Sequence, residues 1–586
     1  MILKLKNFIR NSDIINLVII VFLILILTLL LGNHHMSILS DRGREFLIPQ
    51  EILNGQVPYK DITLIYFPLG FYINALLYKL FGVSIDTLLI SQMFLSILYM
   101  LGFYFLSKEF LSKTTSLLLT ILVIVSCIFA CNDLFSFIVP YSYTRAYGIF
   151  ASFLSVFCFI KLFKTDNLKY LYIASIAVGF AISCKLEFFT TVILFIAGLI
   201  LYKKLSVKQY FKIFFVCLIF PIITCGILFL QGVSLQNIID SIKFGIDFAG
   251  TDVMTNFLST AGVYPIKFTE NLKILAKYLP IFVMIILLAF GGLKLNTMFS
   301  KKYFVPLFGI IILYYYCDIY SICFYWLSIP YIIAIIFVYK FNDNFINNRA
   351  IFFILLASLL LGQREFFRLT LDYYGTYSFP LYILSLIVCI KLCVPIYLSG
   401  VEVRKLINFI FILLICMYSN NLYKLRDNTT AYMDTSKGIL YTNENYAFVL
   451  NNAIEYINNN IDKKSTILTL PEGTLINYLT DRKVDMHCFM MDRLYHDAYG
   501  EEKAKNLIES TNNDYILLFR GFDLNNFHHP YLFDPLSSSS GLYIAEHYDI
   551  VTEFKRGTSQ ITILKKSDTI NPIDIEYLNK YLSLDN

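Results

Sequence analysis

Long apolar runs separated by short polar loops extend from about Ile14 to about Met417. As helices, about thirteen of these runs are long enough to cross roughly 30 Å of hydrocarbon, although several are short enough to form broken or re-entrant helices. The predicted spans cover residues 14–32, 87–107, 115–132, 147–163, 171–184, 188–202, 212–231, 278–293, 303–317, 321–339, 350–362, 377–396 and 406–420. The pattern therefore predicts a polytopic helical membrane region over residues 1–420.

The pattern changes at residue 421, where the long apolar runs end and Asn, Asp, Glu and Lys become frequent. The segment "YAFVLNNAIEYI" has apolar residues at 446, 449, 450, 453, 454 and 457, which is a helical period. The segments "STILTL", "DYILLF" and "ITILKK" are typical of short strands. Helices alternating with strands predict a separate soluble α/β domain over residues 421–586.

Composition places the whole chain among integral membrane proteins. Hydrophobic residues make up 57% of it and charged residues 15%, and the mean hydropathy is +0.64. The formal net charge of +6 would suggest an anionic partner for a soluble chain. Here the charges lie mainly in loops between spans, so no nucleic-acid partner is predicted.

The distribution of basic residues predicts the orientation of the chain in the membrane. Lys4, Lys6 and Arg10 precede the first span, and the loops on their side, as far as Arg404 and Lys405, contain far more basic than acidic residues. The opposite loops are nearly balanced. The positive-inside rule then places the N-terminus in the cytoplasm, and an odd number of crossings places the C-terminal domain outside. The first span has no signal-peptidase pattern and is predicted to be a retained anchor.

Ionisable residues are almost missing from the middles of the predicted spans. They gather instead at outer helix ends and in two long outer loops, residues 33–86 and 232–277. Coupled transporters usually carry charges near the bilayer midplane, so this distribution favours a chemical site at the outer interface. The loop 232–277 alternates apolar and acidic residues, as expected of an interfacial helix followed by a mobile segment that covers the site.

The first outer loop contains an ordered series of features between Asp41 and Gly82. It reads "DRGREFLIPQEILNGQVPYKDITLIYFPLGFYINALLYKLFG" and includes an acidic residue after the first span, an amphipathic stretch, a Pro58-Tyr59 turn and an aromatic-Pro-x-Gly-aromatic-Tyr element at 67–72. This series resembles the first external loop of the GT-C class of glycosyltransferases. The nearest resemblance is to bacterial aminoarabinose-type lipid A transferases and protein O-mannosyltransferases. The predicted fold class is thus a polytopic α-helical membrane protein with a GT-C-like core and a C-terminal soluble α/β domain.

The resemblance implies an inverting glycosyltransferase that moves a hexose or pentose from a polyprenyl monophosphate donor to a cell-envelope acceptor. That acceptor could be a glycan, a lipid or a protein. Asp41 takes the position of the acidic residue at the catalytic centre, where a carboxylate can accept the proton of the attacking hydroxyl. Asp133 in "CNDLF" is the candidate for a second acid from the next outer loop. The alternatives are a solvated carboxylate beside a helix end for Asp41 and a helix cap for Asp133.

The same resemblance implies a set of cations for the donor phosphate. The candidates are Arg44, Lys60, Lys185, Arg364 and Arg368. Guanidinium and ammonium groups suit a leaving phosphate, although Lys185, Arg364 and Arg368 could equally be interfacial anchors. Two positions depart from the family pattern: Phe67 stands where relatives often carry Lys, and Arg42 stands where many carry a second acid.

No metal or cofactor site is predicted. The missing acidic pair at Asp41-Arg42 argues weakly against an obligatory divalent metal. The adjacent histidines His34-His35 and His528-His529 are interpreted as interfacial and loop residues. Cys488 is the single cysteine after residue 421, so no disulfide can form within the outer domain.

Two other functions remain open on sequence grounds. One is a sugar-lipid flippase or transporter, which should tolerate Asp41→Asn better than a transferase would. The other is a catalytically inactive scaffold of the same fold. The Lys-, Asn- and Ile-rich composition favours a bacterial inner membrane, and membrane lipids are the remaining expected partners.

Overall fold

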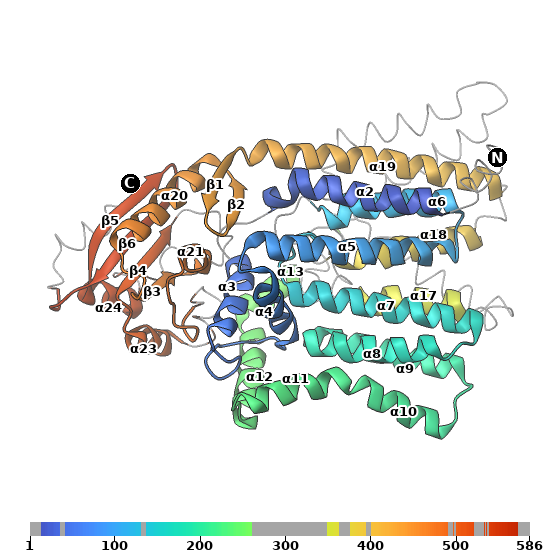
Figure 1. The fold of residues 1–586 in the computed structure, drawn as a ribbon, viewed down its shortest axis with the longest axis horizontal. Helices are drawn as coiled ribbons and strands as arrows, with labels where there is room; N and C mark the ends of the chain where they lie inside the picture. Colours follow the sequence, from blue (N-terminus) through green and yellow to red (C-terminus); the bar gives the residue numbers. More distant parts are fainter. Residues whose placement is uncertain are drawn as a thin grey trace.

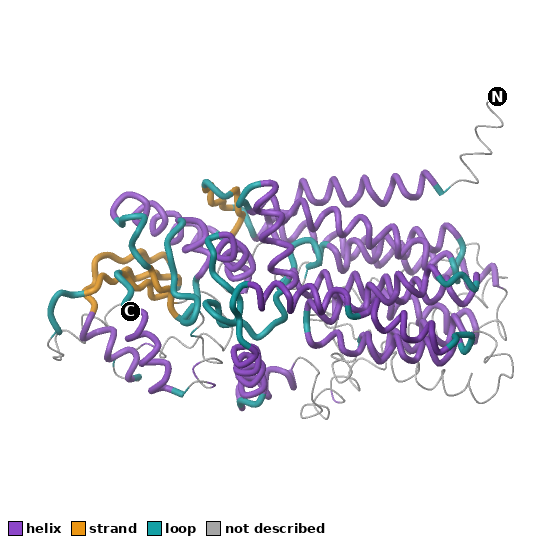
Figure 2. The backbone as a smooth tube through the Cα atoms, turned by 60° about the horizontal axis from the view of Figure 1, so that its bottom comes forward, coloured by secondary structure: helices purple, strands orange, loops and turns teal. Residues whose placement is uncertain are grey.

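A computed structural model of the chain describes residues 13–35, 41–130, 136–260, 349–362, 375–393, 400–489, 500–520 and 538–571, with six single positions between them. Helices run side by side along the long axis, and all the strands lie at one end of them (Figure 1). A turned view shows the same separation between the helical bundle and the strand-containing end (Figure 2). The described strands thus lie apart from the apolar helices; the predicted division into two domains at residue 421 remains a prediction.

Apolar helices form the bundle. They are α2 (Ile14–Leu31), α5 (Ile85–Lys108), α6 (Lys113–Val123) with the π-helix η2 (Ile124–Ile128), α7 (Tyr143–Thr165), α8 (Lys169–Cys184), α9 (Phe189–Tyr202), α10 (Val207–Cys217), α11 (Ile219–Leu230), α17 (Arg349–Leu361), α18 (Gly375–Cys393) and α19 (Gly400–Asn428). Each lies on a predicted span. The predicted spans 278–293, 303–317 and 321–339 fall outside the described residues.

Length and hydropathy single out five of the described helical stretches as able to cross a membrane. They are Ile14–His34, Ile85–Lys108, Tyr143–Thr165, Val207–Leu230 and Ile407–Asn428. Shorter apolar helices, such as Lys169–Cys184 and Leu186–Tyr202, pack among them. The thirteen-span count remains a prediction.

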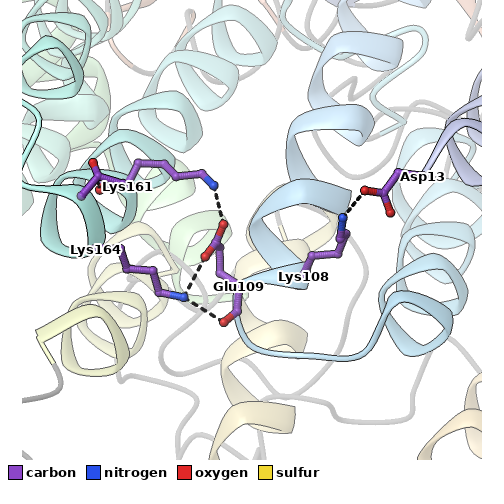
Figure 3. Close-up of polar contacts among 6 residues, drawn as sticks. Asp13, Lys108, Glu109, Lys161 and Lys164 are labelled. Atoms are coloured by element: carbon purple, nitrogen blue, oxygen red, sulfur yellow. Dashed lines mark hydrogen bonds and ion pairs between the residues drawn. The ribbon is translucent and has the colours of Figure 1, made fainter. Parts of the chain in front are cut away.

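Ion pairs join several helices at the end of the bundle away from the strands. Glu109 accepts hydrogen bonds from Lys161 and from Lys164, whose Nζ lies 2.7 Å from the carboxylate (Figure 3). Asp13 likewise pairs with Lys108, and Lys113 Nζ lies 3.6 Å from Asp13. The helices are thus connected at this end by lysines, the residues on which the predicted cytoplasmic orientation rests.

Short helices form a layer between the bundle and the strands. They are the 3-10 turn η1 (Gly32–His35), α3 (Asp41–Leu53), α4 (Leu69–Phe81), α12 (Leu235–Ala249) and α13 (Asp252–Thr260). Both predicted outer loops are therefore largely helical where they are described. α12 runs across the direction of the spans (Figure 1).

α12 is amphipathic, as the sequence predicts for this loop. Leu235, Ile239, Ile242 and Ile246 recur with helical spacing and are all exposed. Phe248 is buried, and Gly245 faces Ile65 of the first outer loop. An apolar stripe on a helix that crosses the direction of the spans fits the predicted interfacial position.

The C-terminal region is an α/β unit. Its hairpin consists of β1 (Ala431–Thr435) and β2 (Gly438–Thr442), and its four-stranded sheet has the order β3-β4-β6-β5, with β3 parallel to β4 and the other pairs antiparallel. The sheet strands are β3 (Ile467–Leu470), β4 (Tyr515–Arg520), β5 (Tyr548–Arg556) and β6 (Ser559–Lys566), and the helices are α20 (Glu444–Asn460), α21 (Thr474–Thr480), α23 (Glu501–Thr511) and α24 (Ser539–His547). The predicted helix and three predicted strands are confirmed. α19 continues past residue 421 to Asn428 before the first strand begins.

α3 packs directly against α21 of the C-terminal region. A Cβ atom added to Gly43 would lie 2.4 Å from the backbone nitrogen of Leu475, so only glycine permits this approach. Polar contacts support the same interface: Lys437 Nζ lies 2.7 Å from Asp481 Oδ1 and 3.3 Å from Gln50 Oε1. The helix that begins at Asp41 is therefore held from outside by the C-terminal region.

Gly43→Ala should destabilise this interface, because the new methyl group would collide with backbone that cannot rotate away. The expected cost is about 1–3 kcal/mol of unfolding free energy, measured as a lower thermal midpoint together with faster hydrogen exchange in α3 and α21. Gly226→Ala is the matched control, since an added Cβ in α11 meets nothing within 4 Å. Unchanged unfolding and exchange in Gly43→Ala would contradict the packing described here.

Candidate functional site

The first part of the candidate site lies on α3. Arg44 and Glu45 are 5% and 2% exposed, although both lie in a predicted outer loop. Glu45 Oε2 accepts a hydrogen bond from the backbone N–H of Tyr143, at 3.0 Å. Burial raises the pKa of Glu45 to about 7, against the opposing effects of the Arg44 charge and the Tyr143 hydrogen bond. Glu45 is therefore partly protonated near neutral pH.

The second part is an ion pair between α7 and the turn that follows α8. Arg145 Nε donates to Glu187 Oε1 at 2.6 Å, and Arg145 Nη2 donates to Glu187 Oε2 at 2.5 Å. This bidentate geometry is the strongest that a guanidinium and a carboxylate can make. The Arg145 side chain is 3% exposed and the Glu187 side chain 18%. The pair holds the start of α7 against η3 (Leu186–Phe188), the turn that precedes α9.

Lys185 connects the two parts. It is buried between the end of α8 and η3, and its Nζ lies 4.1 Å from the ring centroid of Tyr66 and 5.9 Å from that of Tyr141. Burial, reinforced by the positive charge of Arg145, lowers the pKa of Lys185 to about 8, while Glu187 and Glu45 act in the opposite direction. Arg44 also lowers this pKa. Arg44, Glu45, Arg145, Lys185 and Glu187, here named the outer charge cluster, are therefore electrostatically coupled.

Gly70 explains how the loop element at 67–72 reaches this cluster. A Cβ atom at Gly70 would lie 2.4 Å from Thr144 Cγ2 and 2.8 Å from Thr144 Cα. The start of α4 therefore touches the start of α7 directly beside Arg145. Tyr66 lies just before this element, and its hydroxyl is 3.3 Å from that of Tyr141. The aromatic-Pro-x-Gly pattern thus positions backbone and rings around the cluster.

The structure brings two of the predicted phosphate ligands, Arg44 and Lys185, into one cluster. Asp41 begins α3, but its side chain lies outside the described part of the chain, as do Asp133, Arg364 and Arg368. Their roles remain predictions. Lys60 is described and exposed; its Nζ lies 3.8 Å from the position of a Cβ on Gly232. No described contact joins Lys60 to the cluster.

Glu45, Arg145 and Glu187 were not among the predicted site residues. Glu45 and Glu187 stand beside Arg44 and Lys185 in "DRGRE" and "CKLE", so proximity to a predicted ligand was an available signal. Arg145 lies two residues before the predicted span 147–163, where a basic residue resembles an ordinary interfacial anchor. Its partner is 42 positions away.

No group of three or more His, Cys, Asp or Glu side chains within the described residues is placed to hold a metal ion. His34 has a packing role: its ring stacks on Tyr441 at 4.1 Å between centroids, and its Nδ1 lies 2.6 Å from Thr429 Oγ1. The imidazole thus joins the end of the first span to the C-terminal hairpin. His528 and His529 lie outside the described residues.

Residues 66–229 match the family model described as dolichyl-phosphate-mannose-protein mannosyltransferase. The resemblance predicted from the first outer loop is therefore confirmed for this stretch, which contains Tyr66, Arg145, Lys185 and Glu187. The match covers less than a third of the chain and does not include α3. A comparison with curated protein sequences found no match.

Several solved structures are similar to the whole chain. The oligosaccharyltransferase of Archaeoglobus fulgidus in the apo form has a TM-score of 0.49 at 13% identity, with 95% of this chain and 74% of that one covered. The archaeal oligosaccharyltransferase AglB from Archaeoglobus fulgidus, in complex with an inhibitory peptide and a dolichol-phosphate, has a TM-score of 0.47 at 12% identity, with 97% of this chain and 75% of that one covered. ArnT from Cupriavidus metallidurans bound to undecaprenyl phosphate has a TM-score of 0.42 at 11% identity, with 95% of this chain and 99% of that one covered.

Glu187→Gln should destabilise the protein, because it leaves the Arg145 guanidinium buried without its carboxylate. The expected loss is about 3–5 kcal/mol, seen as a lower midpoint of thermal unfolding in detergent. Asp166→Asn is the matched control, since it breaks the Lys204–Asp166 pair, whose side chains are 52% and 56% exposed. That change should cost less than about 1 kcal/mol. Equal losses of stability in the two variants would show that the buried pair stabilises the protein no more than the exposed pair does.

Proposed function

We propose that this protein transfers a sugar from a polyprenyl monophosphate donor to a cell-envelope acceptor at the outer face of the membrane, with inversion at the anomeric carbon. The observation that carries the proposal is the outer charge cluster. It contains three cations and two carboxylates, one of them partly neutralised at pH 7. Buried guanidinium and ammonium groups suit an anionic ligand such as a phosphate.

The family match supports the class of donor. The matched stretch contributes Arg145, Lys185 and Glu187 to the cluster, and the family is described by its dolichyl-phosphate-mannose donor. Such donors carry the sugar phosphate at the end of a hydrophobic chain and reach the site through the bilayer. Nucleotide sugars are kept in the cytosol, so a site at the outer face would not meet them.

Each residue then has a distinct role in the proposed reaction. Arg44 and Lys185 bind the donor phosphate and stabilise the negative charge that it gains as the sugar leaves. The Arg145–Glu187 pair holds Lys185 in place. An acceptor oxygen attacks the anomeric carbon, the bond from that carbon to the phosphate oxygen breaks, and the leaving polyprenyl phosphate keeps the electron pair. The acceptor proton passes to the Asp41 carboxylate, which acts as general base.

Lys185 also offers an answer to the departure at Phe67, where relatives often carry lysine. Its ammonium group lies over the ring of Tyr66, the residue immediately before Phe67. A cation is therefore supplied next to the usual position, from a different helix end. This arrangement supports Lys185 as the main lysine ligand of the phosphate and leaves Lys60 as a secondary candidate.

The proposal is tested by incubating the purified protein with a panel of polyprenyl monophosphate sugars and cell-envelope extract, and measuring the polyprenyl phosphate released. Asp41→Asn should lower the rate about 100- to 10,000-fold, as expected for loss of a general base. Asp240→Asn, on the exposed face of α12, is the matched control and should retain the wild-type rate. If the wild-type protein releases no polyprenyl phosphate from any donor, the result would favour a flippase or an inactive scaffold.

Lys185 predicts a pH dependence of phosphate binding. Its pKa of about 8 means that the ammonium is charged at pH 7 and loses its proton as the pH rises through 8. A phosphate monoester is already doubly ionised in that range, because its second pKa is near 6. The affinity for undecaprenyl phosphate should therefore fall about tenfold or more between pH 7 and 9.5.

Lys185→Arg should lose less affinity over the same range, because a guanidinium does not titrate there and only the further ionisation of Glu45 opposes binding. Lys79→Arg replaces an exposed lysine of α4 and should reproduce the wild-type profile. A flat wild-type profile, or an arginine variant that loses affinity in parallel with the wild type, would exclude Lys185 as a phosphate ligand.

A further inference from the structure

The C-terminal region contains an open groove away from the outer charge cluster. It lies between β1 and α20 and has a volume of about 770 Å³. Small-molecule sites commonly have volumes of roughly 300–1,000 Å³. Arg556, at the end of β5, closes one side of the groove. The size is thus adequate for a ligand, and its class must be judged from the lining.

One face of α20 supplies most of the lining. Glu444, Phe448, Asn451, Glu455 and Asn458 recur at intervals of three and four residues, so they share one side of the helix. All five are exposed, and the buried Ala447 and Ile454 line the groove beside them, whereas Leu450 and Ile457 are buried on the far side of the helix. The groove face therefore carries carboxylates, amides and one aromatic ring.

A second aromatic ring comes from β1. Tyr432 is 59% exposed and Phe448 is 42% exposed, so large apolar rings from both walls are open to solvent. Arg556 already pairs with Glu444 at 3.3 Å, and its guanidinium lies 5.3 Å from the Phe448 ring centroid. The side-chain carboxylates of Asp434 and Glu455 have no hydrogen-bond or ion-pair partner among the described residues. The groove thus combines accessible rings with accessible acceptors.

We infer that this groove binds a saccharide. A sugar ring presents apolar C–H groups on its faces and hydroxyls around its edge, which match exposed aromatic rings flanked by carboxylates and amides. The amides of Asn451 and Asn458 can donate and accept at once, as paired hydroxyls require. Taking this saccharide as part of the acceptor rests on the proposed function.

A peptide adding as a strand to β1 is the main competing occupant. The Asn451 side chain already donates to the carbonyl oxygen of Tyr432 at 3.2 Å, which occupies a backbone acceptor that an added strand would need. Three carboxylates against one arginine would favour a cationic peptide on charge alone. A cationic peptide attracted by charge alone would leave the two solvent-exposed rings without a role. A sugar ring can pack on both of them, so the rings favour the saccharide.

The position of the groove fits a ligand from the cell envelope. The β1–β2 turn touches the start of α5, where the N–H of Ile85 donates to the carbonyl oxygen of Lys437 at 2.9 Å. One wall of the groove is therefore fixed to the outer end of a predicted span. A glycan held there would be close to the membrane surface.

Binding of short neutral oligosaccharides of hexose and N-acetylhexosamine to the full-length protein in nanodiscs tests the inference. Saturation-transfer NMR reports which sugar protons lie against aromatic side chains, and calorimetry gives the affinity. The double variant Tyr432→Ala/Phe448→Ala should bind about tenfold more weakly or not at all. Leu542→Ala, which removes an exposed apolar side chain from α24, is the matched control and should bind as the wild type does.

Thermal unfolding verifies that the double variant is folded, and a lysine-rich peptide is the competing probe. Saccharide binding that the double variant retains, binding of the peptide alone, or binding of neither probe would each overturn the inference. Release of polyprenyl phosphate is measured separately. A protein that binds saccharide in the groove but releases no polyprenyl phosphate would contradict the proposed function and leave the groove as a saccharide site.

Discussion

The burial of several charges in one place, at the end of the bundle that faces the strands, is the constraint on which the other features of the site depend. A charge that leaves water must find a partner, and Arg145 finds Glu187 in a bidentate pair. Arg44 and Lys185 lie in the same region as Glu45, whose carboxyl is partly neutralised by burial. Two arginines and a lysine thus lie with two carboxylates in a poorly solvated region, so the cluster depends on the packing that surrounds it.

Such a cluster needs rigid support from several directions, because its members come from distant parts of the chain. The close approach at Gly70 sets the start of α4 against the start of α7, and the close approach at Gly43 sets α3 against α21. The C-terminal region is therefore part of the support of the site and does more than cover it. Contacts from Lys437 to Gln50 and Asp481 add directional bonds to the same interface. A shift of the C-terminal region would be transmitted to α3 and so to Arg44 and Glu45.

The apolar helices could be predicted from sequence because a run of apolar residues is a local pattern. The thickness of the bilayer sets the length of that run, and the backbone must satisfy its hydrogen bonds within it. The helix α20 and the strands β3, β4 and β6 were predictable for a similar reason, since each has its own short periodicity. The pairing order β3-β4-β6-β5 and the contact of Gly43 with Leu475 join distant segments, and no local pattern contains them. The site residues divide in the same way, into those that a local pattern indicates and those that need a distant contact. Arg44 and Lys185 were predicted from a family pattern. Arg145 is identified only by its ion pair with Glu187, which is distant in the sequence.

The amphipathic helix α12 connects the site to the bilayer in physical terms. Its exposed isoleucines would be costly in water and favourable at the boundary of the acyl chains, while Asp240, Lys243 and Asp247 can remain hydrated. Residues 57 and 65 of the first outer loop lie near this segment, through Val57 packed with Val233 and Ile65 facing Gly245. A helix held at the lipid surface would therefore fix the depth of the loop that leads to Tyr66 and Lys185.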